Sequence, residues 1–192
     1  MSKWELPQSG HMDRATGVYL QTMNMTEINA RLKQNDLIII PVGSTECHGA
    51  AQPLGEDTFL VTRMAEQVAL KTGCTVAEPV WYGSHPYNHL GMPGTVVVPE
   101  DIFLGQLRAI IAGLWNMGFR KQIFVNGHGQ EEVLPLAIHQ WAKKYQVPAI
   151  LVIAACLSLP TTVVGVSFGQ FFLESVPSRY RGDVVGMRIA IM

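Results

Sequence analysis

Two predicted strands each run directly into a short loop of carboxylate and imidazole side chains, and this feature constrains the fold more than any other. The first strand is the uninterrupted apolar run Leu37–Val42, and the second is Lys121–Val125. The side chains that follow are Glu46, His48 and Asp57 after the first strand and His128 after the second. An open α/β sheet places its chemistry at the ends of its parallel strands. The sequence therefore predicts one site, built where these two strands end.

Predicted helices alternate with predicted strands along most of the chain. The helices are expected at Thr26–Lys33, Asp57–Lys71, Pro99–Asn116 and Glu131–Tyr145, and the strands at Leu37–Val42, Thr75–Ala77, Lys121–Val125 and Ala149–Ala154. This alternation predicts βαβ units, and hence an α/β fold with a mainly parallel sheet. We expect Thr26 to cap the first helix and Asp57 or Thr58 to cap the second. Gly73 and Gly118 are expected to end the second and third helices.

The rest of the chain before residue 130 is expected to be irregular. Residues 1–24 resemble an arm, and residues 79–98 form a long loop rich in proline and glycine. A loop of that length inside a domain is usually functional. Of its two histidines, His85 and His89, the second is the better candidate for a site because it lies next to the segment Gly91–Thr95.

Composition limits the classes of function. The 192 residues are enough for one domain, and a net charge of −1 offers no electrostatic footprint for nucleic acid. Only 15% of the residues are charged, against roughly 25% in typical soluble domains, so we expect self-association to cover part of the surface. The scattered cysteines Cys47, Cys74 and Cys156 favour a reducing cytoplasm over a disulfide framework. The first residues carry no apolar core of a signal peptide.

The first loop has the chemistry of a metal site. Glu46 and His48 are two residues apart, so in an extended segment both side chains could face one ion. Asp57 opens the next helix and could cap it with one oxygen and bind metal with the other, or bridge two ions. Carboxylates with imidazoles suit Zn²⁺ or Mn²⁺. The alternative is that Asp57 is an ordinary helix cap and that Glu46 and His48 belong to a solvated loop.

The second loop strengthens this interpretation. His128 lies between two glycines, which allow the backbone to approach a ligand closely. A single loop histidine is more often inert than catalytic, but a second strand end already carries ligands. Cys47, between two of the expected ligands, would need a paired base to act as a nucleophile, and this is the less favoured alternative.

Three ordered segments resemble the creatininase (creatinine amidohydrolase) family. Gly43–Gly49 reads Gly-Ser-Thr-Glu-Cys-His-Gly, with Asp57 nine residues after its histidine. His89–Thr95 reads His-Leu-Gly-Met-Pro-Gly-Thr, with methionine where the family usually has phenylalanine, and Asn126–Gly129 reads Asn-Gly-His-Gly. The resemblance covers about residues 20–153. The sequence Gly-His-Gly-Gln-Glu-Glu is closer to the keto-inositol hydrolase branch than to creatininase itself.

The resemblance implies an α/β three-layer sandwich with a mainly parallel sheet, assembled as a homo-oligomer that is usually a hexamer. It also implies a two-metal centre with Zn²⁺, Mn²⁺ or both. By motif match, His48, Asp57 and His128 would hold one ion. Glu46 and Asp57 would hold the other, with Asp57 as the bridge. At the position of the glutamate that completes the second site in creatininase, this chain has Gln130.

The implied activity is metal-dependent hydrolysis of a small cyclic carbonyl substrate. The bond broken would be either C–N in a cyclic amide or C–C in a cyclic keto-inositol. Bound metals would generate hydroxide and polarise the carbonyl. His89 and Gln130 are expected to contact the substrate or to handle protons.

The C-terminal part departs from the family. We treat residues 1–192 as a single domain in which 154–192 is an atypical tail, divergent or truncated. The tail lacks the acidic and histidine-containing motif that family members carry in their last third. The alternative function is therefore a catalytically weak or inactive homologue that acts only by assembly. The uncharged run Leu151–Leu173 is long enough to cross a bilayer, but Pro160, Gly165 and Gly169 interrupt it, so a membrane span is the less favoured reading.

Overall fold

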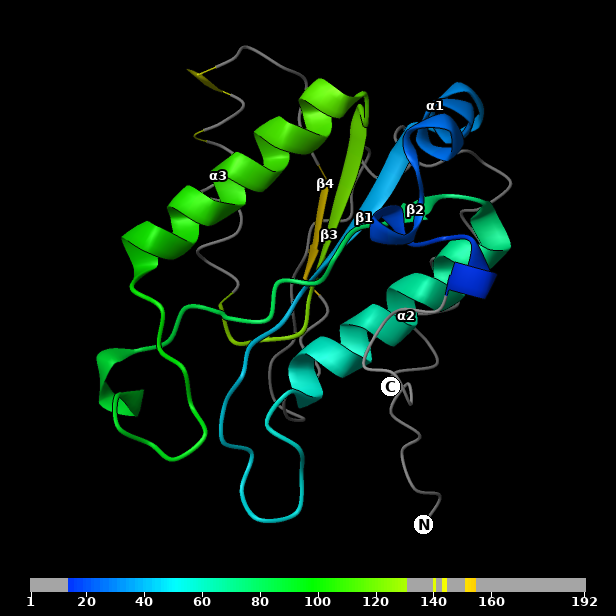
Figure 1. Ribbon diagram of the computed structural model, residues 1–192. Helices are drawn as coiled ribbons and strands as arrows, with labels where there is room; N and C mark the ends of the chain where they lie inside the picture. The colour runs from blue at the N-terminus through cyan, green and yellow to red at the C-terminus, as the bar shows by residue number, and fades with distance from the viewer. Residues whose placement is uncertain (1–13, 131–139, 141–142, 145–150, 155–192) are drawn as a thin grey trace. The chain divides into compact units, whose positions relative to one another are not determined.

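The computed structural model describes residues 14–130, 140, 143–144 and 151–154 (Figure 1). The helices are α1 (Met25–Gln34), α2 (Glu56–Thr72) and α3 (Glu100–Met117), with short 3-10 helices at Arg14–Thr16, Leu20–Thr22 and Tyr87–His89. The strands are β1 (Leu37–Val42), β2 (Thr75–Val76), β3 (Lys121–Asn126) and β4 (Leu151–Ala154). All of these residues belong to a unit that spans Met1–Ser158, and the remaining unit, Leu159–Met192, lies outside the described residues.

The four strands form one sheet in the order β2-β1-β3-β4, and every neighbouring pair is parallel. This confirms the predicted α/β class. Strand β1 has β2 as its neighbour on one side and β3 on the other, so the connection that follows β1 and the one that leads into β3 run to opposite sides of it. Crevices that bind ligands form at the carboxyl ends of strands whose connections diverge in this way. Val42 pairs with Asn126, so β1 and β3 end at the same level and their loops begin side by side.

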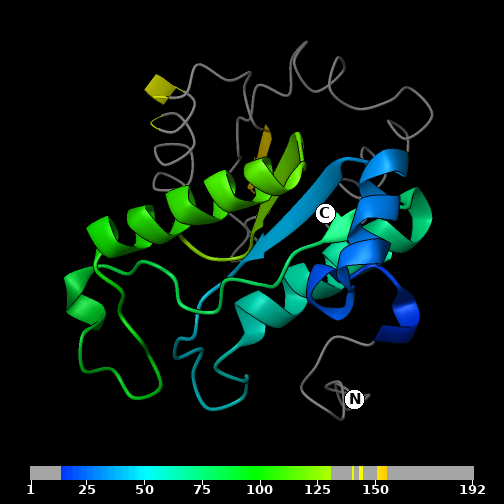
Figure 2. The ribbon, with the colours of Figure 1, turned by 45° about the horizontal axis from the view of Figure 1, so that its top comes forward.

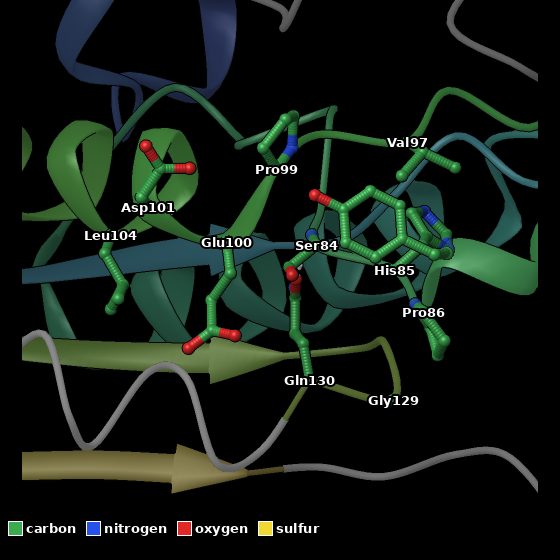
Figure 3. A pocket seen from close by; sticks show the side chains of 11 residues that line it. Ser84, His85, Pro86, Val97, Pro99, Glu100, Asp101, Leu104, Gly129 and Gln130 are labelled. Carbon is green, nitrogen blue, oxygen red and sulfur yellow. Dashed lines mark hydrogen bonds between the residues drawn. The ribbon is translucent and has the colours of Figure 1, made fainter. Parts of the chain in front are cut away.

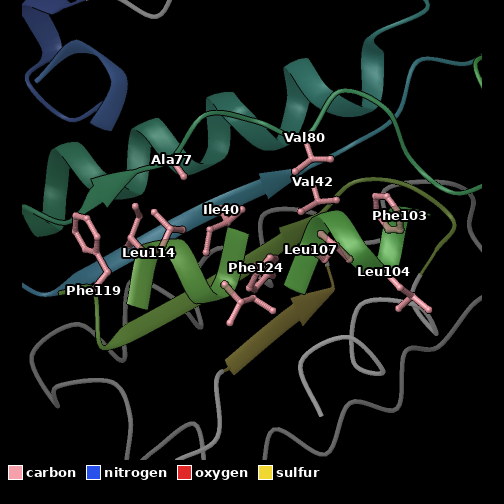
Figure 4. Close-up of a cluster of buried hydrophobic side chains, with 12 residues drawn as sticks. Ile40, Val42, Ala77, Val80, Phe103, Leu104, Leu107, Leu114, Phe119 and Phe124 are labelled. Atoms are coloured by element: carbon pink, nitrogen blue, oxygen red, sulfur yellow. The ribbon is translucent and has the colours of Figure 1, made fainter. Parts of the chain in front are cut away.

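Helices cover both faces of the sheet because side chains alternate along β1. Ile38 and Ile40 point to one face, where they pack with Phe103, Leu107 and other α3 residues (Figure 4). Ile39 points to the other face and joins a cluster that includes α2 residues. Helices α2 and α3 therefore lie on opposite sides of the sheet, as Figure 2 shows, and the described part of the chain has the predicted three layers.

Two predicted helix caps are wrong. Helix α1 is capped by Asn24, not Thr26, because Asn24 and Glu27 form a reciprocal capping box. Helix α2 begins at Glu56 after Gly55, and neither Asp57 nor Thr58 caps it. Both side chains instead bind Ser44 of the loop after β1, which ties the helix start to that loop. The predicted helix ends at Gly73 and Gly118 are confirmed.

Some of the other predicted boundaries agree with the structure and some differ from it. Strand β1 has the predicted bounds, while β2 is one residue shorter and β3 one residue longer than expected. The predicted arm is partly built into the core, since Val18 and Tyr19 are buried and Tyr19 donates a hydrogen bond of 2.7 Å to Glu66. Most of the predicted helix Glu131–Tyr145 and the tail after Ala154 lie outside the described residues.

The first turn of α2 approaches the ends of β1 and β3 more closely than a side chain would allow. A Cβ atom added at Gly43 would lie 2.6 Å from the Cα atom of Thr58. At Gly127 it would lie 2.6 Å from the carbonyl oxygen of Asp57 and 2.7 Å from Cγ1 of Val61. Glycine at both strand ends therefore lets the helix bring Asp57 against the two loops.

We predict that Gly127→Ala lowers the free energy of unfolding by about 1–3 kcal/mol, the usual cost of overpacking a tight site. The new methyl group would collide with helix backbone, which has no rotamer to escape into. The matched control is Gly129→Ala in the same loop, where nothing lies within 4 Å of the added atom. The measurement is thermal and urea unfolding of both variants, and equal stability of the two would contradict the steric argument.

Candidate metal centre

Five ionisable side chains from four parts of the fold meet where β1 and β3 end. Glu46 and His48 come from the loop after β1, Asp57 from the first turn of α2, His128 from the loop after β3, and His85 from the loop that follows β2. Ser44 fastens the helix to the loop, since its hydroxyl donates to Asp57 Oδ2 at 2.8 Å and its carbonyl accepts from the Thr58 hydroxyl at 3.2 Å. The structure thus brings together all four predicted metal ligands.

The two carboxylates lie between the imidazoles. His48 Nε2 is 3.4 Å from Glu46 Oε1 and 3.2 Å from Asp57 Oδ1. His128 Nδ1 is 3.0 Å from Glu46 Oε1 and 3.1 Å from Asp57 Oδ2. These separations are close to the roughly 3.4 Å between two ligand atoms of a tetrahedral ion with 2.0–2.1 Å bonds. Small side-chain movements would therefore suffice to seat a metal ion.

The hydrogen bonding of His128 points to a cation in this cluster. Its Nε2 lies 3.0 Å from the carbonyl oxygen of Ser84, which can only accept, so Nε2 carries a proton. In the neutral ring the Nδ1 lone pair would then face the oxygens of Glu46 and Asp57. That arrangement is stable only with a positive charge between them, either a proton or a metal ion. A backbone partner that fixes the tautomer is also what metal-binding histidines commonly have.

The pKa shifts reflect the same charge pattern. Burial alone would lower the pKa of His128, but hydrogen bonds and charges from Asp57 and Glu46 outweigh it and raise the pKa to about 9. Burial alone would raise the pKa of Glu46, but His128 and His85 reverse this and hold it well below its usual range. The Glu46 carboxylate therefore stays ionised and attracts a cation, which suits a divalent metal.

His85 is the cluster member that the sequence analysis passed over. Its side chain is fully buried, and its Nδ1 lies 3.3 Å from Glu46 Oε2. His89, the preferred histidine, is half-buried, and its ring centre lies 5.7 Å from that of His85. A signal was present: Val80, Gly83 and His85 repeat the order of apolar residue, glycine and histidine that marks the loop of His128.

Gln130 lies beside the cluster rather than in it. Its Nε2 donates to the Gly43 carbonyl at 3.3 Å and to Asn126 Oδ1 at 3.1 Å. Its Oε1 accepts from the backbone N–H of Ser84 at 2.9 Å. The side chain is buried, and both ends of its amide are engaged within the protein.

Among the residues that the structure describes, two overlapping groups have the geometry to hold metal ions: Glu46, His48 and Asp57, and Glu46, His85 and His128. Within each group the ligand atoms lie within 4.8 Å of one another. Glu46 belongs to both groups, whereas the motif match gave the shared position to Asp57. Asp57 still contacts both His48 and His128, so either carboxylate is placed to bridge.

A pocket of about 670 Å³ meets the cluster (Figure 3). Its walls include His85 and Gln130 from the site, Glu100 and Asp101 from the start of α3, and the apolar side chain of Leu104. The other cluster residues Glu46, His48, Asp57 and His128 do not line it, so His85 is the cluster residue that borders the pocket. Its mixed polar and apolar walls suit a small polar ring.

Comparison with known proteins identifies the family. The sequence profile described as creatinine amidohydrolase matches residues 21–178. The chain belongs to the creatininase family. The match runs beyond residue 153, the limit of the resemblance expected from the motifs.

Among curated relatives, the 3-dehydro-scyllo-inosose hydrolase of Thermotoga maritima is 70% identical over 141 residues, which cover 73% of this chain and 45% of the relative. The creatinine amidohydrolase of Pseudomonas putida is 28% identical over 58% of this chain and 45% of its own length. The chain thus spans about half the length of the curated relatives it matches. The high identity places it with the keto-inositol hydrolase-like branch of the family.

Solved structures share the fold. A crystal structure of creatinine amidohydrolase (creatininase) matches with a TM-score of 0.67 at 23% identity, over 73% of this chain and 57% of that one. At this identity the structural similarity shows the fold alone, and this fold agrees with the predicted creatininase-like sandwich. Among the residues that the structure describes, no helix has the length and apolar character that a bilayer crossing requires. Most of the run Leu151–Leu173 lies outside them.

We predict that the metal-free protein loses stability as the pH rises from about 6.5 to 9. The pKa of His128 is about 9 in the folded protein against 6.5 for an ordinary histidine, so folding favours the protonated ring. This contribution is fully present below 6.5 and disappears as the pH passes 9. Its size is on the order of 3 kcal/mol, at 1.36 kcal/mol per unit of pKa.

Urea unfolding in the presence of a chelator at several pH values measures this loss. His128→Gln should flatten the dependence between these pH values, whereas the control His89→Gln should keep it. An unchanged slope in His128→Gln would assign the dependence to another group.

Proposed function

We propose that this chain carries the metal site of a hydrolase that opens a small cyclic ketone bearing hydroxyl groups, of the 3-dehydro-scyllo-inosose type. The observation that carries the proposal is the cluster of two carboxylates and three imidazoles beside a polar pocket. The 70% identity with the hydrolase of Thermotoga maritima supports the choice of substrate class. Hydrolysis of a cyclic amide is the second choice, because the creatinine amidohydrolase of Pseudomonas putida is only 28% identical.

We propose that Glu46, His48, Asp57 and His128 hold two divalent ions, Zn²⁺, Mn²⁺ or both. Solved creatininases of the same fold include a Zn–Zn form and a Mn form, which supports this choice of metals. Carboxylate and imidazole ligands suit both ions. Bound ions would polarise the substrate carbonyl and lower the pKa of water. Because Glu46 belongs to both ligand groups, we favour it as the bridge, with Asp57 as a second contact between His48 and His128.

The pocket would bind and orient the ring. Glu100 and Asp101 offer carboxylates that accept hydrogen bonds from hydroxyl groups, and Leu104 and Val97 offer apolar surface for the carbon skeleton. In a ring with two carbonyl groups separated by one carbon, water adds to one carbonyl carbon, and the bond from that carbon to the carbon between the two carbonyls then breaks. The electron pair of the broken bond is taken up by the second carbonyl as an enolate, and the carbon between the carbonyls receives a proton while the first carbonyl carbon becomes a carboxylate. Among the described histidines, His89 is outside both ligand groups and its ring centre lies 5.7 Å from that of His85, so we propose that it supplies that proton.

We further propose that the chain assembles as a homo-oligomer, a hexamer by family resemblance, in the cytoplasm. Exposed apolar side chains on the loops around the site support association: Leu54, Tyr82, Tyr87, Leu90, Met92 and Val96. Apolar residues gathered on one part of a surface commonly mark an interface. Light scattering coupled to size-exclusion chromatography tests the assembly.

We predict that the purified chain binds about two equivalents of Zn²⁺ or Mn²⁺ and converts 3-dehydro-scyllo-inosose faster than creatinine. A chelator should abolish the activity and added metal should restore it. Glu46→Gln should lower activity by more than ~100-fold, beyond the roughly 10–100-fold cost of losing an outer-sphere partner. The matched control is Glu78→Gln, an exposed glutamate away from the cluster. Metal analysis and product detection by mass spectrometry provide the measurements.

Two results would contradict the proposed function. Activity that survives exhaustive chelation would show that the reaction needs no metal, and would favour Cys47 as a nucleophile instead. Full metal binding without turnover of either substrate would favour the inactive homologue that acts by assembly.

A further inference from the structure

His85 is buried in a way that calls for a ligand. The residues after it, Pro86, Tyr87 and Asn88, are exposed, yet the side chain of His85 is fully buried. In the part of the chain that the structure describes, neither of its ring nitrogens makes a hydrogen bond, although Nδ1 has the Glu46 carboxylate near it at 3.3 Å. Burying a polar atom without a hydrogen bond is costly, and native proteins rarely leave one in this state. A metal ion at the imidazole would satisfy one of the two nitrogens.

The position of His85 is aimed at the cluster. Its Nδ1 lies 3.3 Å from Glu46 Oε2, while His128 Nδ1 lies 3.0 Å from the other oxygen of the same carboxylate. The rings of His85 and His128 are tilted against each other with centres 4.3 Å apart. One carboxylate therefore joins two imidazole nitrogens, and a single ion between them would gain three ligands.

Both backbone polar groups of Ser84, the residue before His85, are hydrogen-bonded to other side chains. The N–H of Ser84 donates to Gln130 Oε1 at 2.9 Å, and the carbonyl of Ser84 accepts from His128 Nε2 at 3.0 Å. Gly83 presses onto the end of β1, since a Cβ there would lie 2.8 Å from the Gly43 carbonyl oxygen. The loop is thus held at the site by contacts that also involve a cluster histidine.

Gln130 holds the His85 loop through its hydrogen bond with Ser84. Its Nε2 donates to the Gly43 carbonyl and to Asn126 Oδ1, and its Oε1 accepts from Ser84. An amide engaged in this way has little left to offer a metal ion, but it fixes the residue next to His85. The same side chain therefore joins the ends of β1 and β3 to the loop of His85.

We propose that His85 is a metal ligand, together with Glu46 and His128, and that Gln130 is a positioning residue that holds His85 in place through Ser84. This inference rests on the proposed metal-dependent function and deepens it. It adds to the proposed centre the one cluster residue that also belongs to the pocket wall.

The first experiment compares His85→Ala with the control His89→Ala, a histidine of the same loop outside both ligand groups. Both full-length variants and the unmodified protein are loaded with Co²⁺, and the visible absorption and bound metal are measured. Zn²⁺ affinity is measured by competition with a chromogenic chelator. His85→Ala should change the Co²⁺ spectrum and weaken binding at one of the two sites by more than ~100-fold, beyond an outer-sphere effect. His89→Ala should change neither.

The second experiment uses Gln130→Glu. If this side chain positions the loop, the new carboxylate faces the Gly43 carbonyl and Asn126 Oδ1 without a hydrogen to donate, so Zn²⁺ affinity should fall. If it is itself a ligand, the added charge should raise the affinity. Circular dichroism of the metal-free variants shows whether each one still folds.

The outcomes separate the two proposals. If the unmodified protein binds no metal, the proposed function and this inference fail together. If the unmodified protein binds about two ions and His85→Ala keeps both, with an unchanged spectrum and affinity, only the assignment of His85 is overturned. A rise in affinity in Gln130→Glu would overturn the positioning role alone.

Discussion

The close approach of α2 to the ends of β1 and β3 is the constraint on which the site depends. Gly43 and Gly127 lack the side chains that would hold the helix away, so its first turn rests directly on both strand ends. The helix thereby places Asp57 within 3.2 Å of His48 and 3.1 Å of His128. The Asp57 carboxylate accepts a hydrogen bond from Ser44 and does not cap the helix. A strand register that aligns Val42 with Asn126 completes the arrangement, because both loops start at one level.

This packing has an electrostatic consequence. It buries Asp57 and half-buries Glu46 beside three imidazoles. The two carboxylates favour the protonated imidazole and raise the pKa of His128 to about 9, although burial alone would lower it. A divalent ion bound here would compete with that proton, because an imidazole must be deprotonated to bind metal.

The sequence predicted the framework well and the details of the site less well. Strand β1 and the helix stop at Gly73 follow from local chemistry, namely an unbroken apolar run and a residue that readily adopts φ of 68°. The predicted caps of α1 and α2 were wrong because other side chains compete for the same hydrogen bonds. Glu27 forms a reciprocal capping box with Asn24, and Ser44 donates a hydrogen bond to Asp57. His85 was passed over in favour of His89 because the choice depends on how the loop folds back. That fold is set by Gln130 and His128, which lie more than 40 residues away in the sequence.

Anomalous X-ray diffraction from crystals of the full-length chain loaded with Mn²⁺ shows directly whether these carboxylates and imidazoles form a divalent-metal centre. We expect anomalous peaks at roughly 2.0–2.3 Å from Glu46, one shared with His48 and Asp57 and one with His85 and His128. Peaks elsewhere, or no peak at saturating Mn²⁺, would rule out the proposed centre.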